Sequence, residues 1–183
     1  EAVVTGIVAE FTGSALEVAE CGEYVEPTAL YVTSTQAGFG TIVRSSLDGV
    51  NTSTLVAGID PDSLVVDKKH NKMFWTHHGD TIMSANLDGT NVQVPIDPFA
   101  APYGLAIDVS GEKIYWTSKG GNPRVMRANF DGTGVETVVS GGCQNNTCRS
   151  IAFDPVTQRV FWAEGQTGGR IMMASVDDGV ASQ

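Results

Sequence analysis

Residues 104–132, GLAIDVSGEKIYWTSKGGNPRVMRANFDG, decide the fold of this chain. They hold a short apolar run ended by Asp108, an aromatic strand around Tyr115, a third strand, and the reversing turn Asp131-Gly132. This sequence motif occurs four times, with its aromatic residue at Tyr31, Phe74, Tyr115 and Phe161. Its period of about 40–45 residues is the length of four short strands with their turns, which is one propeller blade.

Each copy predicts the same order of strands. The apolar runs that end in Asp67, Asp108 and Asp154 predict first strands, and each is followed by a polar turn and the aromatic strand. Asp-Gly pairs such as Asp88-Gly89 reverse the chain after the third strand, because glycine adopts the positive φ that a tight hairpin needs. No long 3.6-residue apolar period supports a helical repeat. We therefore expect an all-β protein made of four-stranded antiparallel blades.

Three tryptophans occupy one position of the repeat: Trp75, Trp116 and Trp162. Apolar neighbours such as Phe74 and Tyr115 flank them, so we interpret them as core between blades. The alternative is a ring of exposed aromatic residues that binds a ligand.

At these residues the chain resembles the YWTD repeat family, the six-bladed β-propellers of low-density lipoprotein receptor relatives and nidogen. The resemblance covers residues 30–183, because several sub-motifs recur there in the same order and at the same spacing. It implies a rigid face of loops that holds protein ligands outside the cell. The chain departs from the motif at its last letter, where the family has Asp and this sequence has Ser34, His77, Ser118 and Glu164.

The number of repeats falls short of six. Residues 64–96 and 104–139 read as two clear blades, residues 30–58 as the later strands of an earlier one, and residues 150–183 as the first strands of a last one. No fourth strand is visible after Asp178-Gly179. We therefore expect about four blade-equivalents over 30–183, after an acidic segment at 1–29. Three explanations stay open: a fragment of a longer propeller, extra strands or a linker from residues 1–29, or completion of the sheet by another subunit.

The charge of the chain excludes several classes of partner. The 183 residues carry a net charge of −10, which disfavours nucleic acid and anionic membrane surfaces. Arg44 is the first basic residue. No run of 18 or more apolar residues predicts a membrane span. The sequence does not begin with Met, which leaves open a removed signal peptide or a trimmed chain.

The three cysteines favour an oxidising compartment. Cys143 and Cys148 flank a short insertion and are placed to form a disulfide, which leaves Cys21 for an intermolecular bond. Two acceptor sequons, at Asn51 and Asn145, lie on predicted loops. Together with the family resemblance, these features predict a secreted protein or the ectodomain of a cell-surface protein.

We find no catalytic constellation, and we expect neither an enzyme nor a cofactor. No phosphate-binding glycine loop and no G-x-S-x-G elbow occurs. His77-His78 can ligate a metal or titrate near neutral pH, but ordinary loop histidines fit as well. His70, in the turn before the same strand, is a third histidine for an acid-dependent switch. The repeated aspartates have turn and cap roles available, so we predict no metal site.

The loops after the aromatic strands are the candidate partner-binding surface. The residues of this surface are His77, His78, Asp80, Lys119, Arg124, Glu164 and Arg170. Arg124 and Arg170 are scarce cations in an acidic protein, and arginine is favoured at interface hot spots. We expect an extracellular protein-interaction or adhesion module. The alternatives are a subunit of an extracellular assembly completed edge-to-edge by its neighbours and, less favoured, a calcium-dependent propeller lactonase.

Overall fold

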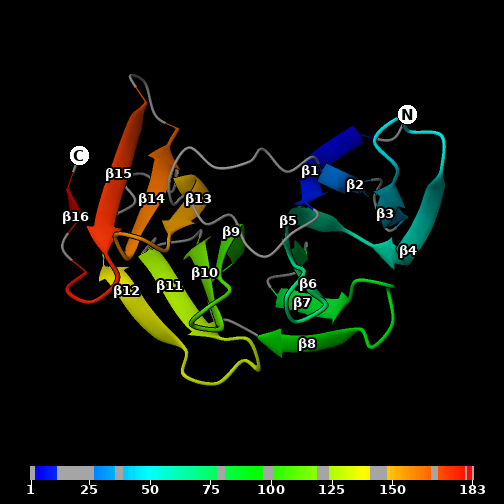
Figure 1. Ribbon diagram of the computed structural model, residues 1–183. Helices are drawn as coiled ribbons and strands as arrows, with labels where there is room; N and C mark the ends of the chain where they lie inside the picture. The colour runs from blue at the N-terminus through cyan, green and yellow to red at the C-terminus, as the bar shows by residue number, and fades with distance from the viewer. Residues whose placement is uncertain are drawn as a thin grey trace.

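Figure 1 shows the computed structural model, which describes residues 3–11, 27–35, 39–77, 81–96, 101–118, 124–140, 148–165, 169–179 and 181–182. These residues form sixteen strands and no helix. The strands of the first two sheets are β1 (Val3–Phe11), β2 (Pro27–Thr35), β3 (Gly40–Ser45), β4 (Thr52–Ile59), β5 (Pro61–Asp67), β6 (Lys72–His77), β7 (Thr81–Asn86) and β8 (Gln93–Ile96). Those of the last two are β9 (Pro102–Asp108), β10 (Lys113–Ser118), β11 (Arg124–Asn129), β12 (Glu136–Ser140), β13 (Cys148–Asp154), β14 (Arg159–Glu164), β15 (Arg170–Ser175) and β16 (Ala181–Ser182).

The strands pair in chain order into four antiparallel sheets, which we call blades 1 to 4. The blades follow one another around an arc, with blade 1 (blue to cyan) and blade 4 (orange to red) at its ends. The first strands lie side by side, β1 with β5, β5 with β9 and β9 with β13. The predicted all-β fold of four-stranded meander blades is confirmed.

The structure adds to the sequence-based prediction in the first and the last blade. The expectation that no fourth strand follows Asp178-Gly179 is wrong, because β16 pairs with β15 through Met173–Ser182 and Ala174–Ala181. This strand escaped notice because only two residues form it. Within the predicted segment 1–29, β1 pairs with β2 and completes the sheet of blade 1. The proposed boundary between an N-terminal segment and the blades stays a prediction.

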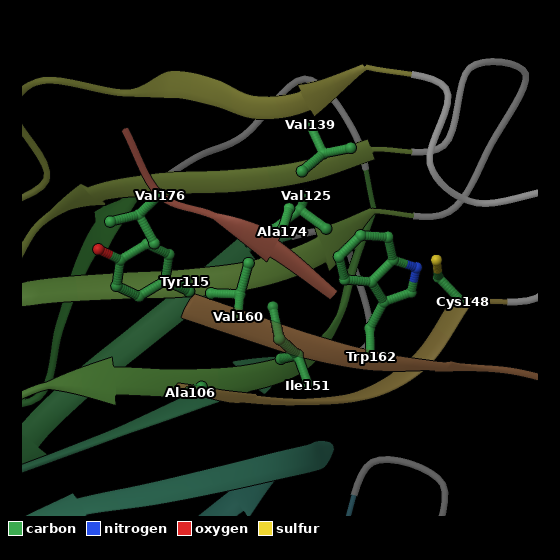
Figure 2. Packing of buried hydrophobic residues seen from close by; sticks show 10 residues of the cluster. All are labelled: Ala106, Tyr115, Val125, Val139, Cys148, Ile151, Val160, Trp162, Ala174 and Val176. Atoms are coloured by element: carbon green, nitrogen blue, oxygen red, sulfur yellow. The ribbon is translucent and has the colours of Figure 1, made fainter. Parts of the chain in front are cut away.

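The space between successive blades holds the core. Trp75, Trp116 and Trp162 are 0–1% exposed and belong to the clusters between blades 1 and 2, 2 and 3, and 3 and 4. Figure 2 shows the last of these clusters, in which Tyr115 and Val125 of blade 3 meet Trp162 and its neighbours of blade 4. The tryptophans are therefore core between blades, as predicted. Burial of such large side chains is a main source of stability in a sheet stack.

A threonine after each of two tryptophans ties one blade to the next. Thr117 accepts a hydrogen bond from the backbone N–H of Gly104 in its own blade (3.0 Å) and donates to the Arg149 carbonyl of blade 4 (2.9 Å). Thr76 repeats this link to the Tyr103 carbonyl of blade 3 at 3.2 Å. In blade 4 the position is Ala163, which has no hydroxyl.

Replacing Thr117 by valine is expected to lower the free energy of unfolding by about 1–3 kcal/mol, because the shape is kept while the buried Gly104 N–H loses its acceptor. Urea unfolding followed by tryptophan fluorescence measures the change. Thr117→Ser keeps the hydroxyl and is the matched control. A valine variant as stable as the parent, with the loss confined to the serine variant, would show that the methyl contact, and not the hydrogen bond, carries the effect.

The Asp-Gly turns of blades 2 and 3 are built alike. Asp88 Oδ1 accepts from the backbone N–H and hydroxyl of Thr90 at 2.9 and 2.6 Å, and Asp131 does the same with Thr133. The glycines have positive φ, with Gly89 at 85° and Gly132 at 87°. The predicted turn role of these residues is confirmed.

The first-strand aspartates also serve turns. Asp108 accepts from the backbone N–H groups of Ser110 and Gly111, both at 3.0 Å, and Asp154 accepts from that of Val156 at 2.9 Å. Asp67 is buried and accepts from the backbone N–H and the ring of His70. Asp67, Asp108 and Asp154 therefore have the turn roles that the sequence predicts.

The turn carboxylates predict a loss of stability in acid. Hydrogen bonds from Ser46, Thr90 and Thr133 hold the pKa of Asp48, Asp88 and Asp131 below the usual value of 3.8. Since the pKa is lower in the folded than in the unfolded chain, these groups stabilise the fold above about pH 4 and lose this effect as the pH falls through their lowered pKa values.

We expect the Tm to decline below about pH 4 more steeply in the parent than in an Asp88→Asn, Asp131→Asn variant, in which neither side chain titrates. Scanning calorimetry between about pH 6 and about pH 2.5 makes the comparison, and the difference between the two proteins removes the effect of overall charge. Parallel curves would refute the role assigned to these turns.

Candidate functional site

The strand ends that flank the predicted loops lie on one side of the blade array. The Asp-Gly turns of blades 2 to 4 pack on the fourth strand of the preceding blade, Gly89 on Leu55, Gly132 on Pro95 and Gly179 on Val138. These turns therefore share one side. Because the strands of a meander alternate in direction, the ends of β6, β10 and β14 lie on the opposite side, which we call the loop side.

His77 is the last residue of β6 and lies on the loop side. Its Nδ1 accepts a hydrogen bond from the backbone N–H of Asp60, in the connection between blades 1 and 2, at 3.2 Å. The ring is half-buried, so its other edge is available. The neighbouring candidates His78 and Asp80 lie outside the described residues, as does Lys119.

Glu164 and Arg170 pair with each other across the ends of β14 and β15. Arg170 Nη2 lies 2.8 Å from Glu164 Oε2, and the Glu164 side chain is 1% exposed against 30% for Arg170. A buried carboxylate requires such a partner. Arg170 is thus held by Glu164 and presents only part of its guanidinium to the surface.

Arg124 opens β11 at the same end of blade 3. Its backbone N–H donates to Ser118 Oγ at 3.1 Å, which closes the loop between β10 and β11. Ser34 makes a comparable link to Thr41 in blade 1 at 3.1 Å. The residues that replace the final Asp of the motif therefore make these side-chain contacts within their own blade or, for His77, to the adjoining connection.

Sequence reasoning missed a pair on the loop side near the first strands. Arg149 Nη1 donates to the Tyr103 hydroxyl at 2.7 Å, and the guanidinium carbon lies 5.4 Å from the centre of the Tyr103 ring. Tyr103 is near the start of β9 and Arg149 near the start of β13, so the pair joins blades 3 and 4. Arg149 is exposed. The available signal was a cation directly after Cys148 in an acidic chain.

The remaining predicted sites are only partly described. Cys148 is buried and disulfide-bonded. Its predicted partner Cys143 lies outside the described residues, as do Cys21 and Asn145, so the pairing and the second sequon stay predictions. Asn51 is exposed beside the Asp48-Gly49 turn, where its backbone bonds Ser46. In the described part of the chain no helix is long and apolar enough to cross a membrane.

The described side chains on the loop side are of the kinds that form hydrogen bonds and stack. Among the described residues no group of three or more His, Cys, Asp or Glu side chains converges to hold a metal ion. The groups that face outward there are a guanidinium, a phenol, an imidazole and the edge of an ion pair. Such groups donate hydrogen bonds and stack, which suits contact with a protein surface.

The relatives of this chain include low-density lipoprotein receptor-related proteins. The chain is 30% identical over 154 residues to the low-density lipoprotein receptor-related protein 1 of Pyricularia oryzae, covering 72% of this chain and 50% of that protein. It is 28% identical over 143 residues to the human low-density lipoprotein receptor-related protein 5-like protein, covering 75% of this chain and 55% of the relative. The chain thus spans about half the length of these relatives. No family model matches it.

Solved structures share the fold. The nidogen/laminin complex contains a chain that matches with a TM-score of 0.73 at 24% identity, covering 84% of this chain and 59% of that chain. A gluconolactonase of Xanthomonas campestris matches with a TM-score of 0.64 at 16% identity, covering 84% of this chain and 56% of that chain. At these identities the likeness concerns the fold and not the activity.

Proposed function

Because this chain belongs to the YWTD-repeat β-propellers, we propose that it is a non-catalytic protein-interaction module that works outside the cell. The loop side is the binding face. We assign to it Arg149 and Tyr103, together with the residues predicted from the sequence, His77, His78, Asp80, Lys119, Arg124, Glu164 and Arg170. The Cys143–Cys148 disulfide and glycosylation at Asn51 and Asn145 belong to the same proposal.

The observation that carries the proposal is the Arg149–Tyr103 pair. An exposed arginine that already rests against a tyrosine needs little further ordering when a ligand binds, and both residue types are favoured at hot spots. The pair is held on two packed first strands, which fixes its position more firmly than a loop would. The matching nidogen structure is a complex with laminin, which is consistent with protein binding by this fold.

Selection from a phage-displayed peptide library tests the proposal. We expect enriched peptides to bind the purified chain and to lose at least about tenfold in affinity toward an Arg149→Ala, Tyr103→Phe variant. The matched control is Arg159→Ala, since Arg159 is an exposed arginine at the opposite end of the blade 4 strands. No enrichment, or equal affinity for both variants, contradicts the proposal.

A hydrolase is the less favoured function. The lactonase likeness rests on the fold, and the described residues bring no metal-binding cluster together. We expect no hydrolysis of a panel of sugar lactones in the presence of calcium or manganese. Turnover that depends on the metal ion would reverse the assignment.

A second candidate, a subunit of an extracellular assembly, is favoured by the outer face of blade 4. Ile171 is 64% exposed, whereas Ile42, Ile82 and Val125 at the same position of blades 1 to 3 are 0% exposed under the following blade. Ala163 also lacks the threonine link on this face. Within the described residues this apolar face is uncovered.

If the assembly forms, light scattering after size-exclusion chromatography will show a species that Ile171→Asp dissociates. Val156→Asp, at an exposed apolar residue of a turn, is the matched control. Adding reductant separates the contribution of Cys21. A monomer at every concentration, with and without reductant, excludes this candidate.

A further inference from the structure

A hollow opens between blades 2 and 3 on the side of the Asp-Gly turns. Its volume is about 820 Å³. Phe74 and Ser84 line it from β6 and β7, Val94 from β8, and Phe130 and Asp131 from the turn of blade 3. Ser84 is 3% exposed and Phe74 is 1% exposed, so both lie at the bottom of the hollow.

The same place between blades 3 and 4 is filled by an arginine. Arg127 Nε donates to Glu136 Oε1 at 2.7 Å, and its Nη1 donates across to the Val176 carbonyl of blade 4 at 3.1 Å. It also shares a hydrogen bond with the Tyr115 hydroxyl. Arg127 therefore joins two blades and closes the gap between them.

The strand registers show which residues of blade 2 correspond to Arg127, Tyr115 and Glu136 of blade 3. The corresponding side chains of blade 2 are smaller or uncharged. Arg127 pairs with Tyr115 and Glu136 across its neighbouring strands, and Ser84 pairs with Phe74 and Gln93 in the same way. Ser84 thus stands where blade 3 has its arginine. Gln93 stands where blade 3 has the carboxylate that binds it.

The acceptor on the next blade is also present. Phe130 in blade 3 corresponds to Val176 in blade 4, since each bonds the preceding turn through its backbone N–H, Phe130 to Glu112 and Val176 to Gln158. The Val176 carbonyl accepts from Arg127. In the described part of the chain no donor reaches the Phe130 carbonyl.

The hollow is lined by charges of both signs. Two carboxylates line it, those of Glu112 and Asp131. Lys72 and His70 line it as well, and the His70 ring lies 2.6 Å from Asp67 Oδ2 and 3.6 Å from Glu112 Oε1. The half-buried Phe130 ring, which packs on Phe74 with its centre 4.8 Å away, gives a surface on which a planar guanidinium can stack.

We propose that this hollow binds an arginine side chain of a protein partner. The guanidinium takes the place that Arg127 takes one blade further on, and donates to the Phe130 carbonyl and the Gln93 amide oxygen. Glu112 and Asp131 supply the opposite charge. Arginine is preferred to lysine because its planar fork reaches two acceptors at once. The site is on the opposite side from the Arg149–Tyr103 pair and does not depend on it.

The test is a titration of the ¹⁵N-labelled 183-residue chain with the peptide acetyl-Gly-Arg-Gly-amide, followed by NMR. We expect saturable amide shifts at residues 93, 94 and 129–131, and at least about tenfold weaker binding of the citrulline peptide, which has the same shape without the charge. The lysine peptide is expected to bind more weakly than the arginine peptide. Equal affinity for arginine and citrulline, or shifts that never saturate, overturn the proposal.

Two variants locate the site. Ser84→Arg with Gln93→Glu rebuilds the blade 3 arrangement and is expected to abolish the shifts at residues 93, 94 and 129–131. Arg127→Ser with Glu136→Gln opens the corresponding place between blades 3 and 4, and is expected to add a second set of shifts around Val176. The second variant decides the matter if the first fails to fold. The assignment is contradicted if the folded Ser84→Arg, Gln93→Glu variant binds the peptide as the parent does. It is also contradicted if the Arg127→Ser, Glu136→Gln variant shows no second set of shifts.

Discussion

Replacing Gly132 by alanine is expected to destabilise the chain by roughly 2–5 kcal/mol, the combined size of a strained positive φ and an overpacked contact. Gly132 has φ = 87°, and a Cβ there would overlap the Pro95 carbonyl oxygen of blade 2. Since Pro95 O belongs to a backbone paired in a sheet, it cannot move aside as a flexible side chain can. The substitution must therefore displace blade 3 from blade 2.

Gly49→Ala is the matched control for this experiment. Gly49 occupies the same turn position in blade 1 with φ = 74°, but an added Cβ there meets no atom within 4 Å in the described residues. Its cost is expected to be the backbone strain alone, about 1 kcal/mol. Urea unfolding of both variants separates strain from blade packing. Equal losses would mean that the glycine serves only the turn and that the close approach of the blades is unimportant.

Replacing Trp116 by alanine is expected to cost about 3–5 kcal/mol, the usual range for a large buried aromatic residue. The side chain is 0% exposed and packs with Phe74, Ile82 and Ile96 of blade 2. The loss removes contacts on both sides of the interface between blades 2 and 3, so the two blades should separate more easily.

Trp116→Phe distinguishes packing from hydrogen bonding. The Trp116 Nε1–H is buried and has no acceptor in the described structure, so removing it sacrifices no hydrogen bond. We therefore expect phenylalanine to recover more than half of the stability lost in alanine. The free energy of unfolding from urea titrations provides the measurement. A phenylalanine variant as unstable as the alanine variant would point to a partner for the indole N–H.

The repeated positions could be predicted from the sequence because each has a local reason. An Asp-Gly pair can be recognised as a turn from its own two residues. Trp75, Trp116 and Trp162 occupy the same position of the aromatic strand, and the residues next to them are apolar. The fold follows from this recurrence. The short β16 carries no such signal, because two residues show no alternation.

The site was harder to predict because its contacts join residues that are far apart along the chain. Glu164 was interpreted as a loop residue, yet Arg170 allows it to be almost fully buried. The Arg149–Tyr103 pair spans two blades, and neither residue stands out alone. The hollow at Ser84 becomes visible only when blade 2 is laid over blade 3, where Arg127 fills the same place. Such features depend on how blades pack, which local patterns do not record.

The central claim is that the loop side is the binding face. Hydrogen–deuterium exchange of the chain, with and without a peptide selected from the library, tests it most directly. We expect slower exchange at residues 77–81, 102–104, 118–124, 148–150 and 164–170, and unchanged exchange at the Asp-Gly turns around Gly49 and Gly89. Protection confined to the turn side, with the loop side unchanged, would contradict the claim.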